Sequence, residues 1–134
     1  TPEVVLVRSN EGLGGMSRIF HRLFLDHLIA PLPDWAKVNP PVLLNSWEAK
    51  YFDVNHANIV DMAKQASRIG VDLIVIDDGW FGARNDDTTS LGDWKENFSK
   101  FPLGLNAVAK EVNSYGCRLG LWFEPEMVSE QSVR

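Results

Sequence analysis

The sequence predicts an α/β protein built around a parallel β-sheet. Three apolar, strand-like segments alternate with two segments of helical periodicity, and a glycine follows each of those helices. Because a strand, a helix and a second strand in succession form a right-handed βαβ unit, this alternation predicts parallel neighbouring strands. The chain has 134 residues, of which 45% are hydrophobic and 10% aromatic, and this is enough for one ordinary domain.

The first forty residues predict a separate unit. A short β-rich run at residues 4–7 precedes a helix over residues 16–28, whose apolar positions fall on one face. Four of the seven prolines lie between residues 31 and 41, where they end the helix and mark a connector. We therefore expect one unit at residues 1–40 and the α/β unit at residues 41–134.

The α/β unit begins with a buried strand at residues 42–44. A helix is expected at residues 56–69, because its apolar side chains recur on one side, Asn55 can cap its start and Gly70 can end it. Residues 71–76 then form a nearly continuous apolar run. Such a run is typical of a parallel strand that is covered on both faces.

A long polar loop is expected at residues 79–100. A third helical stripe follows over residues 105–112 and is ended by Gly116, and residues 117–123 are expected to form the third strand. The glycine-rich motifs that bind nucleotides do not open either helix, which disfavours a dinucleotide-binding fold. A (β/α)8 TIM barrel is favoured, of which this chain holds the start, about three βα units.

Composition excludes several classes of protein. The formal net charge is -5 and no basic stripe is present, so we expect no nucleic-acid partner. No apolar run approaches the ~18 residues of a membrane span, so we expect no membrane partner. The single cysteine, Cys117, cannot form an internal disulfide, and this permits the cytoplasmic location that we expect. The chain starts at Thr1 rather than Met and stops soon after a strand at Arg134, so we interpret it as an internal piece of a longer protein.

Acids and large aromatic residues gather where the predicted strands end. These segments are residues 45–53, 77–81 and 122–126, and they hold three of the five tryptophans. In a barrel the active site lies at this end of the strands. Indole faces pack on the C–H patches of a sugar, and a carboxylate accepts hydrogen bonds from its hydroxyls. The pattern therefore favours a polyhydroxylated ligand.

Other interpretations remain open for these residues. Asp77 and Asp78 could instead cap the turn that Gly79 predicts, and each strand-end tryptophan (Trp47, Trp80 and Trp122) could fill the core beneath a loop. Glu124 and Glu126 are either site residues or loop anchors, and the role of Asp53 is open. Side chains that we expect outside the site are the solvated loop acids Asp86, Asp87 and Asp93, the helical His21, His27 and His56, and Cys117, which we expect to be inert packing.

Asp77 and Asp78 suit binding better than catalysis. Successive side chains of a strand point to opposite faces. The two carboxylates of a retaining glycosidase instead lie about 5–5.5 Å apart on either side of one bond. Adjacent acids therefore do not form such a pair, and we expect no catalytic residue at these two positions.

Four motifs resemble those of glycoside hydrolase family 36, the α-galactosidases (melibiases) of bacterial and fungal type. They are the segments 45–53 (NSWEAKYFD), 77–82 (DDGWFG), 90–94 (SLGDW) and 120–127 (GLWFEPEM). The segment 11–17 (EGLGGMS) and its helix resemble the part of that family that joins an N-terminal β-sandwich domain to the barrel. The resemblance covers almost the whole chain in order.

The resemblance implies retaining hydrolysis of terminal α-1,6-linked galactose, as in melibiose and raffinose, with no metal and no organic cofactor. It assigns Asp77 and Asp78 to the galactose hydroxyls at C4 and C6. It places Trp122 and Trp47 at the sugar pocket, with Trp47 either bordering the aglycone or reaching in from a neighbouring subunit. The family's nucleophile lies in a Lys-Trp-Asp-x-Asn motif on a later strand, with the acid/base further on, and neither motif occurs here. We therefore expect this chain to be inactive alone, and its full-length parent to be a homo-oligomer, a tetramer by resemblance.

Two alternatives compete with this hypothesis. One is a metal-dependent barrel enzyme in which Asp77 and Glu124 bind a divalent cation. The other is a non-catalytic or truncated sugar-binding fragment.

Overall fold

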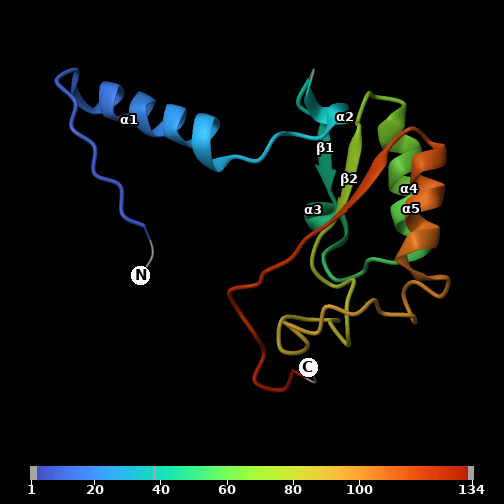
Figure 1. Cartoon of the computed structure of the whole chain (residues 1–134). Helices are drawn as coiled ribbons and strands as arrows, with labels where there is room; N and C mark the ends of the chain where they lie inside the picture. The colour runs from blue at the N-terminus through green and yellow to red at the C-terminus, as the bar shows by residue number, and fades with distance from the viewer. Residues whose placement is uncertain (1–2, 38, 133–134) are drawn as a thin grey trace. The chain divides into compact units, whose positions relative to one another are not determined.

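The structure is a computed structural model that describes residues 3–37 and 39–132. The chain divides into two compact units, residues 1–39 and residues 40–134. In Figure 1 the first unit runs from blue to cyan and the second continues through green and yellow to red. Within the described residues, no helix is both long enough and apolar enough to cross a bilayer.

The first unit is helical. Helix α1 (Gly12–Leu23) continues directly into a π-helical turn, η1 (Phe24–Leu28), and a single-turn helix, α2 (Asp34–Lys37), follows. The helix begins four residues before the start that the sequence predicted, because the glycine-containing segment at residues 12–15 is itself helical. Gly15 is buried, and a Cβ atom there would lie 2.6 Å from the Cβ of Glu11, so this glycine permits close packing at the start of the helix.

The β-rich run at residues 4–7 does not form a strand. The described part of the first unit contains no strand with which it could pair, and a strand needs a ladder partner for its backbone groups. Val4 and Leu6 are 79% and 92% exposed. The apolar composition of residues 4–7 was therefore not sufficient to form a strand within the described part of this unit.

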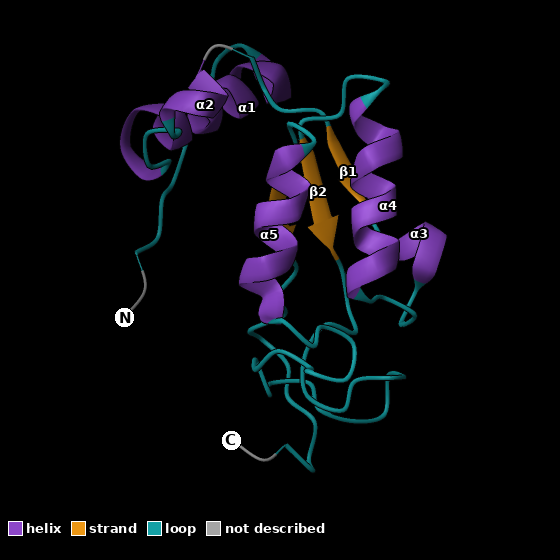
Figure 2. Ribbon diagram, turned by 90° about the vertical axis from the view of Figure 1, so that its right-hand side faces the viewer, coloured by secondary structure: helices purple, strands orange, loops and turns teal. Residues whose placement is uncertain are grey.

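The second unit contains the parallel sheet that the sequence predicted. Its strands are β1 (Leu43–Asn45), β2 (Leu73–Ile76) and β3 (Arg118–Leu121), in the spatial order β1-β2-β3. Helix α4 (His56–Ser67) connects β1 to β2, and helix α5 (Gly104–Ser114) connects β2 to β3. Both helices lie against the same side of the sheet (Figure 2). The protein is therefore α/β, with two consecutive βαβ units.

The boundaries of these elements differ from the prediction by at most two residues. Helix α4 ends before residue 69, because the N–H of Val71 bonds back to the carbonyl of Ala66 and Gly70 takes a positive φ of 84°. Asn55 caps the start of this helix, as predicted, and its side chain accepts from the backbone N–H of Asn58 at 3.0 Å. A single-turn helix, α3 (Trp47–Lys50), was not predicted.

The core lies between the sheet and the two helices. Ile74 and Ile76 of β2 are fully buried and belong to one apolar cluster with Ile59 of α4 and with Val108 and Val112 of α5. The alternate residues of the sheet, which point to its other face, are more exposed: Leu43 is 51% exposed and Val75 is partly exposed. Asp77 follows Val75 by two residues, so the strand alternation directs it to this more open face.

Candidate functional site

The ends of the three strands are joined by hydrogen bonds into one surface. The Ser46 N–H donates to the carbonyl of Val75 at 2.9 Å, and the Asp77 N–H donates to the hydroxyl of Ser46 at 3.0 Å. On the other side, the Trp122 N–H donates to the carbonyl of Ile76 at 2.9 Å. The structure therefore brings together the three segments that the sequence singled out.

Asp77 has a fixed carboxylate at the edge of the sheet. Its Oδ2 accepts from the side-chain amide of Asn45 at 2.5 Å, and its Oδ1 accepts from the backbone N–H of Asp78 at 2.8 Å. An ionised carboxylate has about four lone-pair sites, so two partners leave acceptor capacity unused. The residue is only partly buried, so its carboxylate is not sealed in the core.

Asp78 forms a buried ion pair with Arg84. The two residues are 6% and 5% exposed. Nε of Arg84 lies 2.9 Å from Oδ1 and 3.1 Å from Oδ2 of Asp78, and Nη2 lies 2.8 Å from Oδ2. The hydrogen bond to Asp78 raises the pKa of Arg84. The two adjacent acids are therefore unequal: Asp77 is accessible, and Asp78 is held by a guanidinium.

A second cation, Lys100, lies beneath the same loops. Its ammonium donates to the carbonyls of Phe52 and Gly79, each at 2.8 Å, and to the carbonyl of Arg84 at 3.1 Å. Burial lowers the pKa of Lys100. Both cations thus fix the backbone or side chains of the segments that carry Asp77 and Asp78.

Trp47 lies at the start of α3, directly after β1. Its backbone N–H donates to the side-chain carbonyl of Asn45 at 2.7 Å, and the same side chain donates to Asp77. The indole ring packs edge-on against Tyr51 and Phe52, with ring centroids 5.1 and 5.2 Å apart. Asn45 therefore links the first aromatic residue of the site to its accessible acid.

Trp122 follows β3 and borders a cluster of rings. Its carbonyl accepts from the indole N–H of Trp80 at 3.0 Å, and its ring meets Trp94 with centroids 6.2 Å apart. Trp80 is 2% exposed, so of the interpretations open for it, the core-filling one is correct. Trp47 and Trp122 are partly exposed. Trp94 belongs to the motif segment at residues 90–94, and its ring stacks on Trp80.

One of the loop acids differs from the prediction. Asp93 is 8% exposed and accepts from the hydroxyl of Ser132 at 2.5 Å, so it is not a solvated side chain. The sequence could not indicate this, because the hydroxyl lies 39 positions away. Asp86 and Asp87 are exposed, as predicted, and hydrogen bonds from Thr88 lower the pKa of Asp86.

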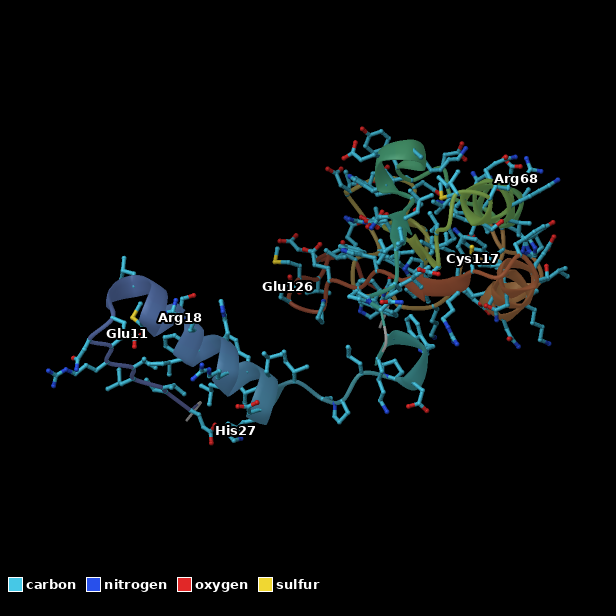
Figure 3. All side chains as sticks on the ribbon, turned by 90° about the horizontal axis from the view of Figure 1, so that it is seen from above. Glu11, Arg18, His27, Arg68, Cys117 and Glu126 are labelled. Atoms are coloured by element: carbon cyan, nitrogen blue, oxygen red, sulfur yellow. The ribbon has the colours of Figure 1, made fainter. Side chains whose placement is uncertain are left out.

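The histidines and the cysteine lie away from the strand ends. His56 is at the start of α4, with Nε2 2.8 Å from a carboxylate oxygen of Glu111, and lines a surface groove of about 590 Å³ between α4 and α5. His21 and His27 lie on the helical segment of the first unit, and both are exposed. Cys117 is 1% exposed and lies between the sheet and the helices (Figure 3), and burial raises its thiol pKa. The interpretation of Cys117 as buried packing is confirmed.

The acids after β3 are less constrained. Glu124 is partly exposed, while Glu126 and Asp53 are exposed, and Glu126 projects from the chain after the strand (Figure 3). Within residues 3–37 and 39–132, no group of three or more His, Cys, Asp or Glu side chains has the arrangement of a metal site. The structure therefore supplies no such cluster around Asp77 and Glu124.

Sequence reasoning missed Arg84 and Lys100. A signal for Arg84 was present: it is the first cation after the two acids, and Gly79 and Gly82 between them allow the chain to turn back. Lys100 carried no comparable signal. Its partners are backbone carbonyls 16 to 48 positions away. Every residue has such a carbonyl, so the sequence does not show which of them a lysine will bind.

Comparison with known proteins agrees with the resemblance. The family model for melibiase matches residues 1–133. The chain is 50% identical over 132 residues to α-galactosidase AgaA of Geobacillus stearothermophilus, and 45% identical over 131 residues to the bifunctional α-galactosidase/sucrose kinase AgaSK of Mediterraneibacter gnavus. These alignments cover 98% of this chain but 18% and 14% of the two relatives, so the chain spans less than a fifth of their length.

Solved structures give the same result. The crystal structure of AgaA carrying two substitutions, in complex with raffinose, superposes with a TM-score of 0.81 at 47% identity, and covers 93% of this chain and 17% of that one. The three-stranded parallel sheet is consistent with the start of the barrel of such enzymes. The fold and the matched motifs define a segment of a glycoside hydrolase. The chain belongs to the melibiase family, the α-galactosidases of glycoside hydrolase family 36.

Proposed function

We propose that this chain forms the galactose-binding part of a retaining α-galactosidase. The full-length protein would hydrolyse terminal α-1,6-linked galactose from galactosides such as melibiose and raffinose. The observation that carries the proposal is the oriented, partly accessible carboxylate of Asp77 beside Trp47, in a chain 50% identical to an α-galactosidase. The complex of AgaA with raffinose supports the choice of substrate class.

In this proposal the galactose hydroxyls at C4 and C6 bind to Asp77 and Asp78, and Trp47 and Trp122 line the sugar pocket. The two acids contribute differently. Asp77 offers lone pairs that its amide partners leave free, whereas Arg84 already occupies much of the Asp78 carboxylate. Asp77 therefore contributes the larger share of the direct contacts. Asp78 offers the sugar only the carboxylate lone pairs that Arg84 does not use.

Hydrolysis with retention needs a carboxylate nucleophile, a proton donor that later acts as a base, and water. We place both catalytic acids in a part of the full-length protein that follows these strands, and we expect the 134-residue chain to be inactive alone. The chemistry itself requires neither a metal nor an organic cofactor. What this chain contributes is the binding and orientation of the galactose ring.

The remaining parts of the proposal concern the whole protein. Residues 1–40 would supply the end of an N-terminal β-sandwich domain and the linker helix that joins it to the barrel, and residues 41–134 would supply the first three strands of the barrel. The full-length protein would be cytoplasmic and a homotetramer. Sedimentation of the full-length protein tests the tetramer directly, since a monomer or dimer would contradict it.

An Asp77→Asn substitution in the full-length protein tests the sugar site. It removes a charge-assisted hydrogen bond worth about 1.5–3 kcal/mol, so kcat/KM for p-nitrophenyl α-galactoside should fall by roughly 10-fold to 150-fold. Asp61→Asn, an exposed position on α4, is the matched control and should leave kcat/KM unchanged. Equal kcat/KM for Asp77→Asn and the unsubstituted protein would remove Asp77 from the site.

The non-catalytic alternative is decided on the full-length protein, because this chain spans less than a fifth of the length of its relatives. If the full-length protein binds galactose without turning over any α-galactoside, this alternative replaces the enzyme. Loss of activity on treatment with a chelator would instead favour a metal-dependent enzyme.

A further inference from the structure

The ammonium of Lys100 donates hydrogen bonds to backbone carbonyls and does not extend freely into solvent as an ordinary surface lysine does. Its three ammonium protons can all be used, since Nζ lies within hydrogen-bond distance of the carbonyls of Phe52, Gly79 and Arg84. The base of the side chain is also fixed: the Lys100 carbonyl accepts from the His56 N–H at 3.0 Å, and Phe101 beside it is fully buried. The ammonium therefore has a defined position.

The three carbonyls belong to two separate loops. Phe52 lies just after α3, and its ring packs on Trp47 with centroids 5.2 Å apart. Gly79 directly follows Asp78, and Arg84 is the residue whose guanidinium holds that same acid. One ammonium thus connects the loop that supports the first tryptophan of the site to the loop that carries both acids.

These two loops approach each other closely where Lys100 connects them. Gly79 has a φ of 101°, and a Cβ atom there would lie 3.1 Å from the Cα and 3.2 Å from the carbonyl oxygen of Phe52. Three carbonyl oxygens directed at one point repel one another unless a donor lies between them. A cation that donates three charge-assisted hydrogen bonds satisfies all of them at once.

We propose that Lys100 is a positioning residue for the sugar site, which holds the loop after β1 against the loop after β2 and thereby sets the spacing between Trp47 and the acids Asp77 and Asp78. The inference rests on the proposed function, because it concerns the same site. Without the ammonium, the carbonyls of Phe52 and Gly79 lose a shared partner and the two loops separate. A sugar that must contact both loops then binds more weakly, although none of its direct partners has changed.

The test compares three variants of the full-length protein: Lys100→Met removes the charge and the donors, Lys100→Arg retains both, and Lys110→Met removes an exposed lysine of α5 as a matched control. The readouts are kcat and KM for p-nitrophenyl α-galactoside and the dissociation constant for galactose. For Lys100→Met we expect KM and the dissociation constant to rise on the order of tenfold to a hundredfold, the loss expected when one charge-assisted hydrogen bond to the sugar is no longer made. Lys100→Arg should recover part of this loss, and Lys110→Met should match the unsubstituted protein.

The split between KM and kcat separates positioning from mere stability. A variant that is partly unfolded has fewer active molecules, which lowers the apparent kcat but leaves KM and the dissociation constant unchanged. Unchanged KM and galactose affinity in Lys100→Met would therefore overturn the inference, even if its melting temperature fell. If Lys100→Met does not fold, Lys100→Gln keeps two N–H donors without the charge, and unchanged KM and affinity in that variant would overturn the inference equally.

Failure of the proposed function gives a different result. In that case the unsubstituted full-length protein neither hydrolyses p-nitrophenyl α-galactoside nor binds galactose. If the unsubstituted protein is active and the Lys100 variants have the same KM and the same affinity for galactose, the proposed function stands and the positioning role does not.

Discussion

The two ends of the parallel sheet are built differently. The turns that lead into β2 and β3 are short and exposed: Ile69 is 82% exposed, and a Cβ atom at Gly70 or Gly116 would meet nothing within 4 Å. The loops that follow the strands contain a buried ion pair, Asp78 with Arg84, and a lysine that donates to three carbonyls. Both ends come from the same strands, so the difference lies in the connecting segments.

This difference separates the stabilising part of the unit from the part that we propose to bind sugar. Burying a charge is costly unless it is paired, so a chain that only had to fold would not need charges beneath its loops. A binding site needs carboxylates in fixed orientations, and the buried cations supply this. The end with the costly interactions is therefore the end where substitutions should have the largest effects.

The largest effect is expected from Arg84→Ala. This change leaves the Asp78 carboxylate buried without its partner, and breaking a buried pair in this way costs about 3–5 kcal/mol of stability. Arg68→Ala, at the end of α4 before β2 (Figure 3), is the matched change at the opposite end of the sheet. Its side chain is exposed, so its cost should stay within about 0.5 kcal/mol. The midpoint of urea denaturation measures both, and similar midpoints for the two variants would contradict the comparison.

A smaller difference is expected between Gly79→Ala and its counterpart before β3, Gly116→Ala. Both glycines have positive φ, 101° and 83°, so either alanine is strained by the backbone, at about 1–3 kcal/mol. A Cβ atom at Gly79 also meets the backbone of Phe52, which adds about 1–3 kcal/mol, whereas the space around Gly116 is open. Urea denaturation should therefore rank Gly79→Ala below Gly116→Ala in stability. Equal losses would mean that the approach of the two loops adds no cost.

The smallest effect concerns Cys117, which directly precedes β3. Burial raises the pKa of its thiol in the folded state above that in the unfolded chain. At pH values below the unfolded pKa both states hold the proton. Above that pKa the unfolded chain releases it first, so stability is lost as pH rises, by at most about 1.4 kcal/mol per pH unit. The measurement is the dependence of the urea midpoint on pH in the alkaline range, which should be less steep in Cys117→Ala. An identical slope in the two proteins would show that the thiol does not contribute.

Much of the second unit could be predicted because its signals are local. The periodicity of residues 56–69 and the apolar run at residues 71–76 depend on neighbours in the sequence, and both elements exist. The run at residues 4–7 has similar local composition, but a strand also needs a partner, and the described part of its unit contains none. Local pattern therefore predicted the helices better than it predicted isolated strands.

By itself, the sequence determined the α/β class, the order of the strands and the three segments that meet at their ends. It did so because alternation and periodicity are properties of adjacent residues, and because parallel strands direct their ends to one edge. Asp77 and Asp78 are adjacent and chemically identical, so the sequence did not show which of them is accessible to a ligand and which is paired with a cation. The tertiary structure decided that difference: strand alternation turns one acid toward the open face, and the loop that returns beneath the strands brings Arg84 to the other. It also decided the role of Lys100, since a bond to a backbone carbonyl depends on where the chain runs and not on which side chains it carries.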